Sequence, residues 1–184
     1  MKQRTNYGNW VPATILRISY GCAVAFLLLF FFSAFCWHNF WAAVIAGLLA
    51  LAAVVIAVFM QVCHHTFSFN GGGLMGEIHQ FLIDHLDWDG HGTLLDIGCG
   101  AGALTNRCAK QFPEATLQGM DYWGMGWDYA KEQCERNAEI EGVADRVTFS
   151  KGDASKLDFA DESFDAAVSN FVFHEVKTQP DKRE

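Results

Sequence analysis

The stretch L-L-D-I-G-C-G-A-G-A-L-T, residues 94–105, decides the fold of this chain. An apolar run over residues 93–97 predicts a short buried strand, and residues 101–112 have the pattern of a helix. Asp96 lies at the end of the strand, where its carboxylate can accept a hydrogen bond from a cationic amino group. The loop between strand and helix contains three glycines, which allow a sharp turn and a close approach to a ligand: Gly98, Gly100 and Gly102. This order is the first half of a βαβ unit.

The alternation of helix and strand continues on both sides of this stretch. Residues 74–86 predict an earlier helix, and residues 126–141 predict a later one. Further strands are predicted at residues 115–120, 146–149 and 165–170. Strands that alternate with helices of this length form a parallel sheet with helices on both faces. The sequence thus predicts an α/β fold, a Rossmann-like doubly wound sheet of about four parallel strands.

Acidic residues follow the second and third predicted strands. Asp121 ends the second strand, where an acid can accept hydrogen bonds from both hydroxyls of a ribose. Tyr122 and Trp123 come next, and their rings can cover an adenine face. The tripeptide Gly152-Asp153-Ala154 follows the third strand. Ligands bind outside the carboxyl ends of strands in open α/β sheets, so these positions predict a nucleotide-type site.

Together these motifs resemble the class I S-adenosylmethionine-dependent methyltransferases. The motifs that carry the resemblance are D-x-G-x-G-x-G at residues 96–102, the acid Asp121, G-D-A at residues 152–154 and F-D-A-A-V-S-N-F-V-F-H-E-V at residues 164–176. The segment L-D-F-A-D-E-S-F-D, residues 157–165, is similar to the ubiquinone-biosynthesis-type branch. The resemblance covers residues 74–176 and implies an enzyme that uses S-adenosyl-L-methionine.

The resemblance implies cofactor contacts at the ends of the first three strands. By position, these are Asp96, Gly98, Cys99, Gly100 and Gly102 for the methionine part, Asp121 and Tyr122 for the ribose and adenine, and Asp153 with the Ala154 backbone for the adenine amino edge. The Cys99 thiol itself has no basic neighbour in the sequence, so we interpret it as structural.

The resemblance also implies the acceptor side of the site. Asn170 would lie at the tip of the fourth strand beside the transferred methyl group, with a role in cofactor binding and in catalysis. His174 and Glu175 would border the acceptor pocket, and His174 is the candidate general base for an acceptor that is protonated at working pH. The expected acceptor is a small molecule, and lipophilic molecules are among the candidates. No metal is required.

Simpler roles stay open for the same residues. Asp96 can cap the following helix, and Asp121 and Asp153 can each stabilise a turn. His174, at a helix start, can be a cap or a surface residue. The loop also satisfies the dinucleotide fingerprint G-x-G-x-x-A, so an NAD-binding oxidoreductase is an alternative, although the segments around strands three and four argue against it. A non-catalytic membrane protein with a degenerate or truncated cofactor fold is another.

The N-terminal part of the chain has a different character. Residues 18–37 and 40–60 are apolar runs, and residues 18–62 contain no Asp, Glu, Lys or Arg. A helix of about 20 residues is about 30 Å long, the thickness of the hydrocarbon core of a bilayer. We therefore expect a two-helix transmembrane hairpin over residues 18–63, with residues 18–62 in contact with membrane lipids. A cleaved signal peptide and two core helices of a soluble protein are the alternatives.

Flanking charges predict the orientation of this hairpin. The basic residues Lys2, Arg4 and Arg17 precede the first run and favour the cytoplasmic side. Two crossings return the chain to that side, so the domain that follows should face the cytoplasm. The predicted division of the chain is a cytoplasmic tail at 1–17, the hairpin at 18–63, a linker at 64–73 and the N-terminal part of a methyltransferase domain at 74–184.

Composition excludes some partners. All 21 acidic residues lie at or after Glu77, and the 13 basic residues form no run. A nucleic-acid ligand is not expected, because a phosphate backbone requires clustered Lys and Arg. The six cysteines form no C-x-x-C pair, which favours reduced thiols and gives no zinc site. The sequence does not predict an oligomeric state.

The sheet of the resembled family has seven strands, whereas this sequence predicts four before it reaches Glu184. We therefore expect an incomplete sheet in which the fourth strand, beside the first, forms an apolar edge. Residues 64–184 alone should aggregate and bind the cofactor weakly, because such an edge offers unpaired backbone groups to other chains.

Overall fold

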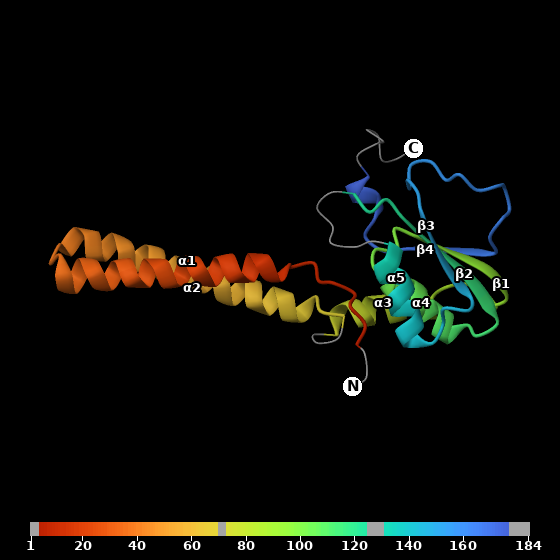
Figure 1. Ribbon diagram of the computed structural model, residues 1–184, viewed down its shortest axis with the longest axis horizontal. Coiled ribbons are helices and arrows are strands. Elements are labelled where there is room, and N and C mark those ends of the chain that lie inside the picture. Colours follow the sequence, from red (N-terminus) through yellow and green to blue (C-terminus); the bar gives the residue numbers. More distant parts are fainter. Residues whose placement is uncertain (1–3, 70–72, 125–130, 177–184) are drawn as a thin grey trace. The chain divides into compact units, whose positions relative to one another are not determined.

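A computed structural model describes residues 4–69, 73–124 and 131–176 (Figure 1). These residues form two compact units, which are considered separately. One unit is residues 9–75, and the other combines residues 4–8 with the chain from Gly76 onward.

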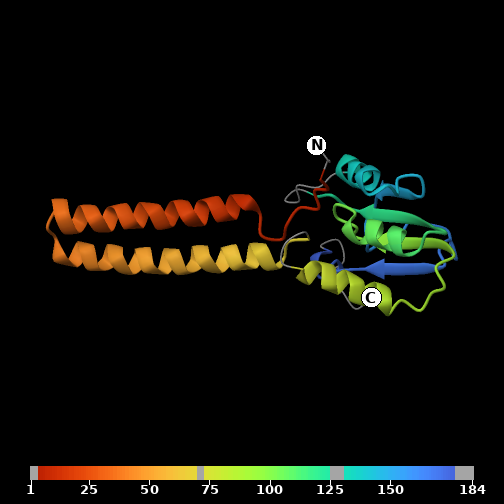
Figure 2. The ribbon, with the colours of Figure 1, turned by 90° about the horizontal axis from the view of Figure 1, so that it is seen from below.

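The first unit is a hairpin of two long antiparallel helices (Figure 2). Helix α1 spans Ala13–Phe31 and continues into the short π-helix η1, Phe32–Cys36, and α2 spans Phe40–Thr66. Helix α1 begins earlier than the predicted run because the Pro12 carbonyl already accepts a helical hydrogen bond from the Ile15 N–H at 2.9 Å. Both helices are long and apolar enough to cross a membrane, judged by length and composition.

Small residues of α2 are buried in the hairpin, whereas large ones point outward. The buried residues of α2 are all alanines: Ala43, Ala46, Ala50, Ala53 and Ala57. They lie three or four positions apart and so share one face, where small side chains allow two helices to approach closely. By contrast, Leu48 is 64% exposed and Phe59 is 60% exposed. The outer surface of the hairpin is therefore apolar, the reverse of a helix that faces water.

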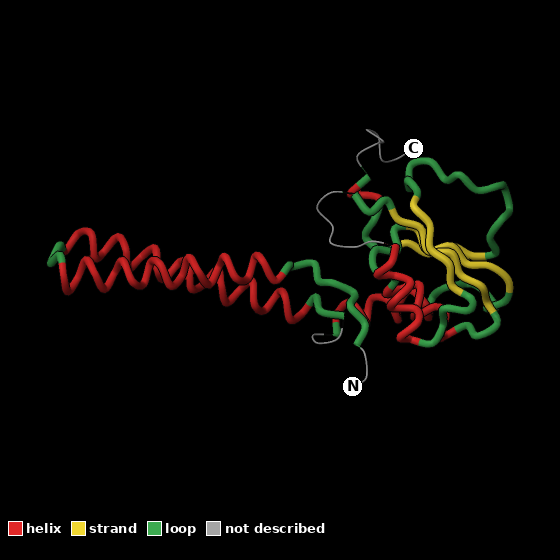
Figure 3. Tube along the Cα trace, in the orientation of Figure 1, coloured by secondary structure: helices red, strands yellow, loops and turns green. Residues whose placement is uncertain are grey.

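The second unit contains a parallel sheet of four strands (Figure 3). In chain order they are β1 Gly92–Ile97, β2 Ala115–Asp121, β3 Val147–Lys151 and β4 Ala166–Ser169. Their order in space is β3-β2-β1-β4, and all neighbours are parallel. The predicted α/β Rossmann-like fold is confirmed, with the first strand beside the fourth. Among the described residues β4 pairs with β1 alone, so it is an edge.

Three helices pack with the sheet into one core. They are α3 Leu74–Asp84, α4 Ala103–Gln111 and α5 Lys131–Glu141. Residues 126–130 of the predicted later helix lie outside the described residues. Alternate strand residues such as Leu94, Leu117 and Phe149 meet side chains from all three helices. On the opposite face Leu95, Ile97 and Met120 are covered by Phe159 and Phe164 of the loop before β4.

Helix α4 begins at Ala103 rather than at the predicted residue 101. Gly102 has a left-handed φ of 81°, a conformation that helix residues do not adopt, so it belongs to the loop. The sheet thereby presents a loop of five residues, 98–102, between β1 and α4. After β4 the chain turns into a short 3₁₀ helix, η2, Phe173–Glu175.

Candidate functional site

The loop of residues 98–102, which we call the glycine loop, is folded back over the end of β2. The N–H groups of Gly98 and Cys99 both donate to the carbonyl oxygen of Met120, at 2.7 and 3.0 Å. Gly98, Gly100 and Gly102 have φ values of 74°, 57° and 81°, which side chains with a Cβ rarely adopt. The three glycines are thus required by the backbone conformation.

Asp121, the last residue of β2, binds the glycine loop through hydrogen bonds to its carboxylate. One oxygen accepts a hydrogen bond from the Gly100 N–H at 2.8 Å, and the other accepts from the Trp123 N–H at 2.8 Å. The carboxylate is half-buried, and each oxygen keeps a further lone pair for a hydroxyl donor. Asp121 therefore combines a structural role with the capacity to accept from a ribose.

Asp96 differs from Asp121 in being almost fully buried, with 1% of the residue exposed. Its carboxylate accepts a hydrogen bond from the Thr105 hydroxyl at 2.6 Å, in the first turn of α4. Burial raises the pKa of Asp96 to about 7, against the lowering effect of the hydrogen bonds from Thr105. The structure thus places Asp96 beneath the start of α4, where it supports the loop from below.

Asp96 leads to a first prediction, about pH. Its pKa is about 7 in the folded chain, above the usual 3.8 of an aspartate, so the folded chain binds more protons between these two pH values. The free energy of unfolding should therefore fall as the pH rises through this window. Asp96→Asn keeps the shape and the acceptor for Thr105 but cannot ionise, so it should flatten this dependence. Thermal unfolding of both proteins between about pH 5 and about pH 8 measures the difference, and parallel curves would contradict the prediction.

The loop after β3 lies at the same end of the sheet as the glycine loop, the carboxyl ends of the strands. The Gly152 N–H donates to the Asp121 carbonyl at 2.9 Å, which draws the G-D-A segment to β2. The Asp153 carboxylate accepts from the Ser155 N–H and hydroxyl at 2.9 and 2.8 Å and so also forms a turn. Ala154 packs on the Ile97 and Met120 side of the sheet.

Residues after β4 reach the glycine loop. A Cβ placed on Gly98 would lie 2.1 Å from Cγ2 of Val172, so the two segments are in tight contact. Asn170 directly follows β4 and is half-buried. His174 lies in η2 and is exposed, and the aromatic residues on either side of Val172, Phe171 and Phe173, are 48% and 52% exposed. The predicted acceptor-side residues thus follow the strand that adjoins β1.

Sequence reasoning missed part of the support of the glycine loop. The Gly100 carbonyl accepts from the Trp123 indole Nε1 at 2.9 Å and from the Cys134 thiol at 3.1 Å. The indole is therefore turned onto the loop, whereas Tyr122 is 58% exposed, with Lys151 Nζ 5.3 Å from its ring centroid.

The neighbouring Cys134 thiol and burial raise the pKa of Cys99, so this thiol stays protonated. Cys134 carried no local signal in the sequence.

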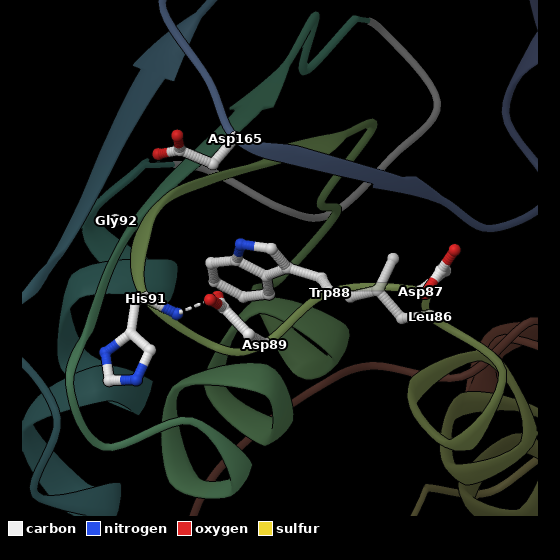
Figure 4. Close-up of a pocket in the computed structure, with 7 residues that line it drawn as sticks. All are labelled: Leu86, Asp87, Trp88, Asp89, His91, Gly92 and Asp165. Carbon is white, nitrogen blue, oxygen red and sulfur yellow. Dashed lines mark hydrogen bonds between the residues drawn. The ribbon is translucent and has the colours of Figure 1, made fainter.

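A hollow at the opposite edge of the sheet is a different feature (Figure 4). It is lined by Leu86, Asp87, Trp88, Asp89, His91, Gly92 and Asp165. Gly92 begins β1 and Asp165 directly precedes β4, so the hollow lies at the amino ends of the strands. The glycine loop and Asp121 lie at the carboxyl ends, where ligands bind in such sheets. In the described part of the chain, no group of three or more His, Cys, Asp or Glu residues is placed to hold a metal ion.

Comparison with known proteins gives consistent matches. Residues 94–184 match the family described as "Methyltransferase domain". The chain is 32% identical over 111 residues to the biotin biosynthesis bifunctional protein BioHC of Teredinibacter turnerae, covering 58% of this chain and 16% of that protein. It is 38% identical over 76 residues to a sterol 24-C-methyltransferase of Yarrowia lipolytica, covering 41% of this chain and 19% of that protein.

A solved structure of a geranyl diphosphate methyltransferase in complex with GPP and sinefungin also matches. Its sequence identity is 23% and its TM-score is 0.48, covering 59% of this chain and 40% of that chain. The chain thus spans less than a fifth of the length of the two curated relatives named above.

Proposed function

We propose that this chain binds S-adenosyl-L-methionine at the glycine loop and transfers its methyl group. The family match and the curated relatives support this proposal, because they indicate a class I S-adenosylmethionine-dependent methyltransferase. The observation that carries the proposal is the junction of the glycine loop with Asp121. There the three glycines of the loop have left-handed φ values, and the Gly100 N–H donates a hydrogen bond to the Asp121 carboxylate, which can still accept further hydrogen bonds. The alternative of an NAD-binding oxidoreductase gains no support from the matches.

The residues present fit this cofactor. Asp121 keeps acceptor capacity beside the glycine loop, and both loops are closely packed, because a Cβ on Gly98 would overlap the Val172 side chain and one on Gly152 the Met120 side chain. We assign the methionine part to the glycine loop with Asp96 beneath it, the ribose to Asp121, and the adenine to Tyr122, Asp153 and Ala154. The bound cofactor supplies an activated sulfonium methyl group, so the protein mainly has to position the acceptor and exclude water.

The acceptor side is proposed to be formed by the segment after β4. Asn170 lies between β4 and the exposed Phe171, and Val172 packs against Gly98, so this segment adjoins the proposed cofactor site. His174 is the proposed general base for an acceptor that must lose a proton. The exposed rings of Phe171 and Phe173 favour a lipophilic small molecule as the acceptor.

The hairpin α1–α2 is proposed to anchor the chain in a membrane. In the most apolar 18-residue stretch of Ala13–Cys36 only 6% is buried, and in that of Phe40–Thr66 only 22% is buried. The core helix of a soluble protein would be mostly buried. Exposed aromatic residues stand at the turn, with Trp37 62%, Phe40 70% and Trp41 72% exposed, as is common at a membrane interface. With both ends of the hairpin on the side of Lys2, Arg4 and Arg17, the methyltransferase domain would face the cytoplasm.

A substitution at Asp121 tests the proposed site. Asp121→Ala removes the carboxylate that holds Gly100 and faces the ribose, so it should weaken binding of S-adenosylhomocysteine by about 1–3 kcal/mol. Calorimetric titration of the full chain in detergent gives the two affinities. Asp145→Ala is a matched control, because Asp145 is exposed and lies two residues before β3, at the opposite end of the strands. Equal affinity for the wild type and Asp121→Ala would remove Asp121 from the site.

A further inference from the structure

The N-terminal segment, residues 4–8, belongs to the same compact unit as the sheet. Figure 2 shows it, in red, beside α5. This placement was not expected, because the sequence assigns these residues to a tail that precedes the hairpin. The segment is held by buried polar side chains of α4 and α5, the two helices that follow the glycine loop and β2.

Asn137 of α5 binds the segment and the glycine loop at once. It is fully buried, with 0% exposed. Its Nδ2 donates to the carbonyl oxygens of Asn6 at 2.8 Å and Ala101 at 2.9 Å. Its Oδ1 accepts from the Asn6 N–H at 2.9 Å and from Gln133 Nε2 at 3.2 Å. Both donors and both lone pairs of the amide are therefore used.

Tyr7 adds a second connection between the segment and the two helices. Its hydroxyl donates to Glu141 of α5 at 3.1 Å and accepts from Nδ2 of Asn106 in α4 at 3.2 Å. Glu141 in turn accepts from Lys110 of α4 at 2.7 Å. Tyr7 is 8% exposed, and burial raises the pKa of its hydroxyl, which stays a neutral donor. The segment thus bridges α4 and α5 next to the loop.

The glycine loop depends on α5 at two successive carbonyl groups. Gly100 accepts from Cys134, and Ala101 accepts from Asn137, one turn further along the same face of the helix. When the Asn6 backbone is removed, Asn137 loses two of its four hydrogen bonds. Leaving a buried polar group unsatisfied is costly, so Asn137 would turn toward other partners and release the Ala101 carbonyl.

We infer that Asn6 and Tyr7 are a functional part of the cofactor site, and that Asn137 is the positioning residue through which they set the conformation of the glycine loop. The inference rests on the proposed function, since it assumes that this loop holds S-adenosylmethionine. It assigns a role in cofactor affinity to a segment that precedes the hairpin in the sequence and lies about 90 residues before the loop.

The backbone nature of the Asn6 contacts allows a sharp test. Asn6→Pro removes the N–H that donates to Asn137, whereas Asn6→Ala keeps both backbone partners and serves as the matched control. The full chain in detergent is titrated with S-adenosylhomocysteine well below the temperature of unfolding. Asn6→Pro and Asn137→Ala should each weaken binding about tenfold, with Asn6→Ala close to the wild type.

A third variant separates positioning from stability. Val143 is a core residue, 2% exposed, in the turn after α5, so Val143→Ala should lower the unfolding temperature without changing the affinity. If the wild type binds and both Asn6→Pro and Asn137→Ala bind as tightly as the wild type, the inference is overturned and the proposed function stands. Loss of affinity in Val143→Ala to the same degree would also overturn it. A wild type that does not bind would overturn both.

Discussion

The full chain should remain in the membrane fraction after washing with high salt and with alkaline carbonate. These washes remove proteins held by charge, whereas a spanning hairpin is held by apolar surface. Each Leu, Ile, Phe or Val near the centre of a spanning helix favours insertion by about 0.3–0.6 kcal/mol, and many of the exposed side chains of α1 and α2 are of these types. Recovery of the intact chain in the supernatant would contradict the prediction.

Two substitutions in the middle of α2 measure the same property directly. Leu49 and Val54 are 43% and 37% exposed on the hairpin, and an arginine near the centre of a span costs about 2.5–3.5 kcal/mol. The double variant Leu49→Arg, Val54→Arg should therefore lose most of its retention in washed membranes. The matched double variant Leu49→Ala, Val54→Ala removes the same side chains without adding charge and should stay bound. Equal retention of the two would show that this helix does not lie in a bilayer.

Gly98→Ala should abolish detectable binding of S-adenosylhomocysteine. The φ of Gly98 is 74°, and a left-handed conformation costs a residue with a Cβ about 1–3 kcal/mol. The added Cβ would also lie 2.1 Å from Val172 Cγ2, so the glycine loop or the segment after β4 must move. Together these effects should lower the affinity by about a hundredfold or more.

Gly142→Ala is the matched control for this prediction. Gly142 has the same φ of 74°, but a Cβ there meets nothing within 4 Å, and the residue lies after α5 and away from the glycine loop. The control carries the backbone strain alone, so it should lose stability and keep its affinity. Similar affinities for Gly98→Ala and the wild type would mean that the loop does not hold the cofactor.

The sequence was sufficient for the features that depend on local pattern. The run before Gly98 is apolar and short, the glycines lie at alternate positions, and Asp121 ends the next strand, so the first strand, the loop and the end of the second strand follow from residues close together in the chain. The order of β1 beside β4 followed from the doubly wound topology. The charge-free runs likewise gave the two long helices, because length and composition suffice for that prediction.

The missed features depend on contacts between distant residues. Asn6 meets Asn137 over a separation of 131 positions, and nothing local distinguishes either residue from an ordinary surface amide. The direction of the Trp123 indole is set by the Gly100 carbonyl, which the sequence cannot place. The burial of Asp96 and its hydrogen bond from Thr105 emerge only once α4 lies on the sheet.

One titration tests the central claim most directly. The full chain in detergent, wild type and Gly98→Ala, is titrated by calorimetry with S-adenosylhomocysteine and, separately, with NAD. We expect S-adenosylhomocysteine to bind the wild type and not Gly98→Ala, and NAD to bind neither. Binding of NAD by the wild type without binding of S-adenosylhomocysteine would contradict the proposed cofactor and assign the glycine loop to a dinucleotide instead.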